Sequence, residues 1–472
     1  MWPRLLVAAS FALSAALAAA PEKTLKYRIQ GLDEATEANV QAHLGPEPKT
    51  EYERNSFLFS AREHITEGLN ALGYYHADIQ LDLKRDPQQW QLAIDIQPGE
   101  RVVFSDIDVR VSGDAAADEA FDELLADIPL QVGQPLNHEH YENFKNELLT
   151  LGRERGYVDA DLSRHQVSVN MDTAEARVEL HYDSGPRYRW GAVTFDDFPL
   201  NQLRLDQLMT FAEGDPVDIG ALQSFQTDLQ RTEYFGCALV QPLSPDRDAR
   251  TITVHVALEP GKRHHFRAGV GYSTDTQARI SLSWRTPLVN AKGHRQNTLL
   301  EYSPVRPRFN VTYGIPLSHP LDDTLALSGR LETNEYGSLD SFQREVAVRR
   351  EFLLGDWVTA AGVRQLWETW DVGPDTRDNN YLLPGMSFAH TLARGNPVDP
   401  EAGFSQWYIA EFGADQAGSD LTLLRLYANW KAVYRLSEKH RLVGRAELGA
   451  VAFSDDQRPD LAPSLSFFAG GS

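Results

Sequence analysis

Three stretches in the first half of the chain place hydrophobic residues on one face of a predicted helix. They recur about every 80 residues and form a weak internal repeat. The apolar faces consist of Ile65, Leu69 and Leu72 in the first stretch, Phe144, Leu148 and Leu151 in the second, and Leu222, Phe225 and Leu229 in the third. The pattern predicts one long amphipathic helix in each copy of the repeat.

The same stretches carry signals for the beginning and the end of each helix. Ser60 and Glu63 have the spacing of a capping box, while Asn137 and Asp218 are suitable N-cap residues for the second and third helices. The predicted helix ends are Gly73, Gly156 and the segment Tyr234-Phe235-Gly236. Each end leads directly into extended chain.

Segments that alternate between polar and hydrophobic residues follow each long helix and predict strands. The clearest are 91–96, 176–182 and 251–258. Shorter helices are expected near 33–44, 116–126 and 201–212. Each copy is therefore predicted to be a β-α-α-β-β unit, in which two helices cover a three-stranded mixed sheet and an edge strand stays exposed.

The second half of the chain alternates with period two from His265 onward. Phe266, Ala268, Val270 and Tyr272 share one face of the first segment. The later segments lie near 280–284, 297–304, 308–315, 322–332, 341–352, 356–367, 381–391, 403–413, 420–435 and 440–453. The pattern predicts eleven strands.

Alternating segments of about ten residues, with aromatic residues near their ends, are typical of a β-barrel in an outer membrane. No apolar run in this half reaches the roughly 18 residues that a helical span requires. Charged residues expected to line the interior of the barrel are Arg344, Arg350, Arg425, Arg445 and Glu447. A soluble β-sandwich or lectin-like domain is the alternative, and the length of the strands argues against it.

Charge divides the chain at the same place. Residues 1–261 hold 43 acidic and 22 basic residues, a net charge of -21, whereas residues 262–472 hold 24 and 23, a net charge of -1. A strongly acidic half repels phosphate backbones, which argues against a partner of the nucleic-acid class. A near-neutral half is consistent with an outer surface that faces hydrocarbon.

Residues 1–20 predict a secretory signal peptide. Arg4 supplies the positive charge, Leu5 to Leu17 the apolar core and Ala16-Leu17-Ala18 the cleavage site. A membrane anchor is less favoured because the apolar run is short. Cys237, the single cysteine, forms no disulfide within the chain and is expected to be a small buried residue rather than a redox thiol.

Catalytic and metal-binding motifs are absent from the sequence. There is no G-x-S-x-G elbow, P-loop, H-E-x-x-H motif or paired Cys-x-x-Cys. His138 and His140 are two residues apart and therefore point to different sides of a helix, which argues against a shared metal. We expect neither an enzyme nor a cofactor.

The order of these features resembles the outer-membrane protein assembly superfamily of BamA/TamA-type proteins. The helix that ends before a tyrosine, the hairpin that follows and the Pro-Gly joint resemble POTRA domains, and three of them precede a β-rich half. The implied domains are a signal peptide at 1–20, POTRA 1 at 21–98, POTRA 2 at 99–184, POTRA 3 at 185–261 and an outer-membrane β-barrel at 262–472. Three units are most similar to TamA-type proteins, since BamA-type members usually carry five and two-partner secretion transporters two.

This resemblance implies a function and partners. The chain would lie in the cell outer membrane with its POTRA domains in the periplasm, and would help to insert or secrete outer-membrane proteins such as autotransporters. Its partners would be a TamB-like protein anchored in the inner membrane and bound through POTRA 1, unfolded outer-membrane client proteins, and the lipid bilayer. A two-partner secretion pore for one cognate protein is the alternative.

The resemblance also implies sites. The first strand of a lateral seam is expected at 265–274, through Phe266, Ala268, Gly269, Val270, Gly271 and Tyr272. The two glycines would weaken pairing there or, alternatively, relieve crowding inside the barrel. Phe467, Phe468, Gly470 and Gly471 resemble the start of a large extracellular loop, which implies a barrel of sixteen strands with about five missing from this sequence.

Val178 and Val254 are expected on exposed strand edges of the POTRA units, where client strands would add by β-augmentation. The alternative is that the three units are only spacers.

Overall fold

The computed structural model describes residues 24–86, 89–196, 204–273, 277–336, 339–372, 374–396, 398–437, 439–453 and 460–467. The predicted signal peptide, residues 1–20, lies outside these ranges. The chain forms two compact units, Met1–Tyr188 and Arg189–Ser472.

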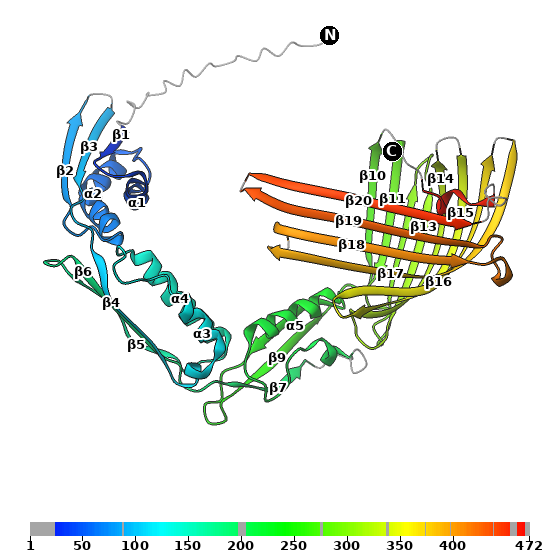
Figure 1. Ribbon diagram of the computed structural model, residues 1–472, viewed down its shortest axis with the longest axis horizontal. Helices are drawn as coiled ribbons and strands as arrows, with labels where there is room; N and C mark the ends of the chain where they lie inside the picture. The colour runs from blue at the N-terminus through cyan, green and yellow to red at the C-terminus, as the bar shows by residue number, and fades with distance from the viewer. Residues whose placement is uncertain are drawn as a thin grey trace, which may run out of the picture. The chain divides into compact units, whose positions relative to one another are not determined.

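The first unit contains two modules with the same order of elements (Figure 1). The first module consists of β1 (Thr24–Gln30), α1 (Glu34–Leu44), α2 (Glu51–Ala71), β2 (Asp78–Arg85) and β3 (Gln89–Gln97). The second consists of β4 (Val103–Ser112), the 3-10 helix η1 (Asp114–Ala117), α3 (Glu119–Ala126), α4 (His138–Glu154), β5 (Asp161–Asn170) and β6 (Glu175–Asp183). Each module has its own core, built around Ile65 and Ile94 in the first and around Phe144 and Tyr182 in the second.

The second unit opens with a third module of the same kind. It consists of β7 (Arg189–Phe195), the 3-10 helix η2 (Leu205–Leu208), α5 (Ile219–Arg231), β8 (Phe235–Pro242) and β9 (Thr251–Pro260). The short helix predicted at 201–212 is wrong for residues 209–212, which are not helical. The carboxylate of Asp215 accepts the backbone N–H of Ala212 at 2.8 Å and forms a turn in place of the next helical hydrogen bond.

All three small sheets place their last strand in the middle. The strand orders are β1-β3-β2, β4-β6-β5 and β7-β9-β8. The central strand pairs in parallel with the first strand of its module and antiparallel with the second. The predicted mixed sheets are thus confirmed, and their edges are the first and second strands.

Helix α2 begins ten residues before its predicted capping box. Its N-cap is Thr50, whose hydroxyl accepts the N–H of Glu53 while the Glu53 carboxylate accepts the N–H of Thr50. Ser60 lies inside the helix, where its hydroxyl donates to the carbonyl of Ser56 at 3.2 Å. The prediction at Ser60 is wrong because both sites have the same spacing, and burial of Phe57 favours the earlier start.

The other predicted caps and helix ends agree with the structure at four positions out of five. Asn137 and Asp218 are the N-caps of α4 and α5, and left-handed glycines, Gly73 (φ 88°) and Gly156 (φ 84°), follow α2 and α4. In the third module Glu233 (φ 59°) takes that position, so the helix ends before the predicted Tyr234-Phe235-Gly236 segment. No helix among the described residues has the length and apolar character to cross a membrane.

The rest of the second unit is one antiparallel sheet whose strands pair in chain order (Figure 1). Its eleven strands within the described part of the chain confirm the predicted number. They are β10 (His265–Ser273), β11 (Gln277–Thr286), β12 (Arg295–Tyr302), β13 (Arg308–Pro316), β14 (Asp323–Tyr336), β15 (Leu339–Leu354), β16 (Trp357–Val372), β17 (Asp375–Gly395), β18 (Pro400–Gly413), β19 (Leu423–Ser437) and β20 (His440–Phe453).

The large sheet has an outer face of exposed hydrophobic residues and an inner face that carries charged groups. Val346 and Val348 of β15 are 52% and 44% exposed on the outer face. Arg344 and Arg350 differ from these valines by even numbers and therefore share the outer face, so their predicted interior position is wrong. Arg350 instead binds Asp323 at 2.8 Å.

The other three predicted interior charges lie on the inner face. Arg425 binds Glu411 of the neighbouring strand at 2.8 Å, and Glu447 accepts a hydrogen bond from Asn429 at the same distance. Arg445 stands two residues from Glu447, opposite Lys431, and therefore on the same face.

The joint between the first two modules is fastened by one arginine. Nε of Arg101 donates to the carbonyl of Leu72, the C-cap residue of α2, at 2.6 Å. Its guanidinium lies 5.4 Å from the centre of the Tyr74 ring. The N–H of Val102 donates to the carbonyl of Gly73 at 2.9 Å. These contacts satisfy carbonyl groups at the helix end that otherwise lack partners.

The chain that leaves the second module repeats this arrangement. Nε of Arg187 donates to the carbonyl of Arg155, the C-cap residue of α4, at 2.9 Å, and its guanidinium lies 5.8 Å from the Tyr157 ring. The N–H of Tyr188 donates to the carbonyl of Gly156. We call these two arrangements the joint clamps, formed by Arg101 and Arg187.

Asp118 anchors the second joint clamp. Its side chain, 5% exposed, accepts from Arg155 at 2.7 Å and from the hydroxyl of Tyr157 at 2.9 Å, and lies 3.3 Å from Arg187. Burial alone would raise the pKa of Asp118, but the hydrogen bonds from Arg155 and Tyr157 outweigh it and lower that pKa below its usual value.

The position of the capping box predicts opposite effects for two similar substitutions. In a fragment of residues 24–188, Thr50→Ala should lower the free energy of unfolding by about 1 kcal/mol through loss of the N-cap. Ser60→Ala should leave it unchanged or raise it slightly, because alanine is favoured inside a helix. Urea unfolding measures both, and a larger loss at Ser60 would contradict the observed helix start.

The lowered pKa of Asp118 predicts acid sensitivity of the same fragment. A carboxylate whose pKa is lowered by folding stabilises the fold above its unfolded pKa, about 4, and that contribution disappears as pH falls through the lower folded pKa. Asp118→Asn should therefore cost stability at pH 7 and weaken the decline between pH 5 and pH 2. Urea midpoints across that range test this, with exposed Asp122→Asn as the control. Identical pH profiles for the wild type and Asp118→Asn would refute the role of Asp118.

Candidate functional site

The first strand of the large sheet lies at its edge. β10 pairs with β11 on one side, and no strand of the described residues lies on its other side. On the outer face Phe266, Val270 and Tyr272 are 69%, 89% and 80% exposed. An edge strand presents unpaired backbone donors and acceptors that are able to add another strand. The structure thus places the predicted seam residues, which also include Ala268, Gly269 and Gly271, on a strand that has one neighbour among the described residues.

The two glycines of β10 have different surroundings. A Cβ on Gly269 would come 2.7 Å from the hydroxyl oxygen of Ser281, whereas a Cβ on Gly271 would meet only the guanidinium of Arg279, at 4.0 Å. Gly269 therefore relieves crowding against β11. Gly271 has room for a side chain, so the lack of one there weakens packing without any steric need.

Val178 and Val254 do not lie on exposed edges. They belong to β6 and β9, the central strands of their sheets, and both are completely buried. The prediction is wrong because alternation identifies a strand that is buried on one face but does not indicate which strands flank it. The edges of these two sheets are β4 and β5, and β7 and β8.

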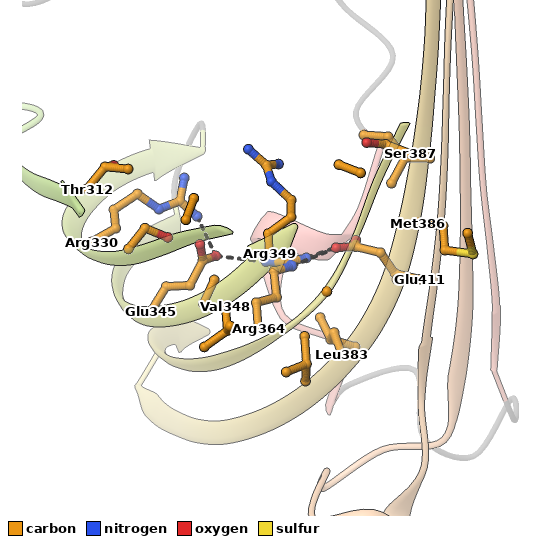
Figure 2. Close-up of a pocket in the computed structure, with 18 of the residues that line it drawn as sticks. Thr312, Arg330, Glu345, Val348, Arg349, Arg364, Leu383, Met386, Ser387 and Glu411 are labelled. Carbon is orange, nitrogen blue, oxygen red and sulfur yellow. Dashed lines mark hydrogen bonds and ion pairs between the residues drawn. The ribbon is translucent and has the colours of Figure 1, made fainter. Parts of the chain in front are cut away.

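A chain of five charged residues crosses the inner face of the large sheet. Figure 2 shows Arg330, Glu345, Arg364 and Glu411 of this chain. Arg330 of β14 binds Glu345 of β15 at 2.9 Å, and Glu345 binds Arg364 of β16 at 2.9 Å. Arg364 forms two hydrogen bonds with Glu411 of β18, at 2.6 and 3.0 Å, and Glu411 also binds Arg425. We call this chain the interior network.

Arg364 is the centre of the interior network. Its side chain is 19% exposed and that of Glu411 is 11% exposed, so water screens their attraction only weakly. The two-point contact between guanidinium and carboxylate holds β16 and β18 in a defined arrangement. Sequence reasoning missed Arg364, Glu345 and Glu411, although charged residues at inward positions of neighbouring strands are a usable signal.

The strands curl tightly where the interior network lies (Figure 2). Gly362 and Gly385 are paired across β16 and β17. A Cβ on Gly362 would come 2.3 Å from the carbonyl oxygen of Val348, and one on Gly385 would come 2.9 Å from that of Ala410. Only glycine permits this close approach of backbones, which encloses a cavity of about 370 Å³ beside the network.

Residues 460–467 pack against the inner face after β20. Ala462 and Leu465 are fully buried in a cluster with Trp370 and Tyr381. The buried carboxylate of Glu368 accepts the N–H of Ser464 at 3.2 Å and is also bound by the Ser464 hydroxyl. This segment is thereby fixed to β16 and β17.

Phe467, predicted to begin a large loop, continues this packing. Its ring stacks on Tyr427 with the ring centres 5.9 Å apart, and Arg425 of the interior network lies 5.0 Å above it. Gly449 makes room for the ring, since a Cβ there would come 2.4 Å from it. The other predicted loop residues, Phe468, Gly470 and Gly471, lie outside the described residues.

The remaining candidates for chemistry have structural partners or lie on the surface. Nε2 of His138 lies 2.8 Å from the Tyr75 hydroxyl across the first joint. Burial lowers the pKa of His138 and raises that of Tyr75, which keeps both neutral at pH 7. Cys237 is exposed, which corrects the expected burial, because Ala238 and Val240 take the inward positions of β8. Within the described ranges, no three His, Cys, Asp or Glu residues are placed to hold a metal.

Comparison with known proteins identifies one domain by its sequence. Residues 26–98 match the family model described as POTRA domain TamA domain 1. This range contains most of β1 and all of α1, α2, β2 and β3.

Solved structures add a likeness in fold. The chain resembles the crystal structure of BamA from Haemophilus ducreyi lacking POTRA domains 1–3, with 12% identity, coverage of 75% of this chain and 71% of that chain, and a TM-score of 0.57. CdiB from Acinetobacter baumannii (12% identity, 74% and 69% coverage) and CdiB from Escherichia coli (13%, 75% and 69%) give TM-scores of only 0.38 and 0.37, too low to support an argument. The chain therefore carries a POTRA domain at residues 26–98 and has the fold of BamA, in which POTRA-like β-α-α-β-β units precede a large antiparallel sheet.

Proposed function

We propose that this protein is an outer-membrane assembly factor that helps to insert or secrete other outer-membrane proteins. The observation that carries the proposal is the BamA fold of the large sheet, which follows directly after three POTRA-like modules. An assembly factor of this kind needs no catalytic group, since it acts by pairing its backbone with client strands and by providing a path for them into the bilayer.

The exposed edge of β10 supplies those backbone partners. A strand in hydrocarbon must satisfy every N–H and C=O within protein, because no water is present to bind them. An incoming client strand that pairs with β10 satisfies its own backbone groups before it enters the bilayer. The lack of a side chain at Gly271 keeps this pairing weak enough to be exchanged.

The interior network ties the later strands of the large sheet to one another. Arg364 connects Glu345 with Glu411, so strands β14 to β19 are tied across their inner face. No member of the network lies on β10, β11 or β12, although Glu301 of β12 pairs with Arg308 of β13 and Arg295 of β12 donates to Thr324 of β14.

The location and partners belong to the same proposal. The exposed hydrophobic residues of the outer face support a place in the outer membrane, with the POTRA-like modules in the periplasm. The match of residues 26–98 to the first POTRA domain of TamA supports a TamA-type role in autotransporter assembly and a TamB-like partner bound through POTRA 1. Unfolded outer-membrane proteins are the proposed clients.

Photo-crosslinking tests whether β10 pairs with clients. With p-benzoylphenylalanine at Val270, the full chain in membranes should crosslink unfolded outer-membrane barrel proteins several-fold more than with the same group at Val346. Both side chains lie on the outer face, but Val346 belongs to a strand that is paired on both sides. Mass spectrometry of the adducts identifies the clients.

Equal crosslinking at the two positions would contradict templating by β10. Adducts with several barrel proteins support the assembly role. Adducts with one secreted protein only would favour the two-partner secretion pore.

Substitution within the interior network should destabilise the large sheet. Arg364→Gln leaves Glu345 and Glu411 without their shared partner, which we expect to cost about 3 to 5 kcal/mol. Arg349→Gln is the matched control, since Arg349 lines the same cavity and has no ion-pair partner among the described residues. Urea unfolding of the full chain in detergent, followed by circular dichroism of the strands, measures both. Similar midpoints for the two variants would show that the network does not hold the sheet.

A further inference from the structure

The arginine of the joint clamp recurs in the third module without its partners. Arg101 and Arg187 each stand two residues after a left-handed glycine, Gly99 (φ 73°) and Gly185 (φ 59°). Arg263 has the same position relative to Gly261. Gly261 is not left-handed, however, and Arg263 makes no hydrogen bond or ion pair among the described residues. Arg263 therefore does not form a joint clamp, unlike Arg101 and Arg187.

Other groups fasten the third module to the large sheet. The carboxylate of Glu233 binds Arg285 of β11 at 2.8 Å, and the hydroxyl of Tyr234 donates to the carbonyl of Gly293 at 3.1 Å. These contacts reach the sheet at β11 and at the turn that follows it. The junction is thus held together without Arg263.

A cavity of about 310 Å³ lies at this junction. Its lining includes Lys262 and Arg263 together with Pro287, Leu288 and Val289 of the turn after β11. Glu233, the acidic residue of the lining, is already paired with Arg285. The cavity therefore combines two cations, which have no ion-pair partner among the described residues, with apolar side chains. A ligand with an anionic headgroup and an apolar remainder would fit this combination.

Two aromatic residues on the outer face of the sheet each lie three positions along the chain from a residue of the cavity lining. Phe266 and Trp284 pair across β10 and β11 with their rings stacked at 6.1 Å, and are 69% and 40% exposed. Aromatic side chains collect where a membrane meets water. The two cations precede β10 by only a few residues and so lie at the level where phosphate groups of lipids are found.

We propose that this cavity binds the headgroup of an anionic phospholipid, with the phosphate on Lys262 and Arg263 and the acyl chains along Phe266 and Trp284. The proposal rests on the placement of the large sheet in a membrane, given under the proposed function. A lipid held there would lie at the N-terminal end of β10, next to the edge on which client strands are proposed to pair. The site favours a net negative headgroup, because a zwitterionic headgroup brings an ammonium group that the two cations repel, whereas phosphatidylglycerol brings only the charge of its phosphate.

Lipid titration of the full chain tests the site. In micelles of a neutral detergent, native mass spectrometry should show retention of phosphatidylglycerol in preference to phosphatidylcholine. Lys262→Gln/Arg263→Gln should weaken this retention by about thirtyfold, since each cation near an anionic lipid contributes roughly fivefold. Arg394→Gln/Lys439→Gln removes the same charge at the end of β17 and in the turn between β19 and β20, outside the cavity lining, and should change retention little. Arg263→Lys should preserve it.

Each other outcome of the titration overturns the site. Equal retention by both double variants would place the lipid elsewhere on the chain. Displacement of the lipid by millimolar inorganic phosphate alone would assign the cavity to a free anion. Flotation of the wild type with vesicles is measured separately, so a failure of the proposed membrane location is distinguished from a failure of the site.

Discussion

Every strand in this protein depends on backbone hydrogen bonds to its neighbours, and a strand with a neighbour on one side only has unpaired backbone groups on the other. The three small sheets protect their most apolar strands, β3, β6 and β9, by placing each between two others. The described part of the large sheet pairs its strands in chain order and has β10 and β20 at its two edges. The backbone groups on such an edge are a general binding surface, because they attract any extended chain whatever its side chains.

Two kinds of polar contact limit how far the rest of the molecule moves. In the first unit, Arg101 and Arg187 satisfy helix carbonyls that would otherwise be unpaired, and thereby fix the chain that enters and leaves the second module. In the large sheet, Arg364 ties strands that curl closely around Gly362. Both use arginine because a planar guanidinium donates several hydrogen bonds at fixed angles and stays charged when partly buried.

The third joint differs from the first two in the role of its arginine. The same residue at the same distance from a glycine acts as a clamp twice, and in the third case faces a cavity at the start of the large sheet. The difference arises from the backbone, since Gly261 does not adopt the left-handed conformation of Gly99 and Gly185. A duplicated structural residue is thus available for binding at the junction between module and sheet.

Local patterns in the sequence determined the kinds and the order of the elements. Alternation with period two was enough to predict eleven strands, and helical spacing with Gly73 and Gly156 was enough to place two helix ends, because these signals depend on neighbouring residues only. Tertiary structure decided whether Thr50 or Ser60 caps α2, which strands flank Val178 and Val254, and that Cys237 is exposed. It also brought together Glu345, Arg364 and Glu411, which lie up to 66 residues apart in the chain. The contacts between strands depend on strand order. The choice between two equivalent capping signals depends on which helix start buries the apolar residues. A short segment of sequence determines neither of these.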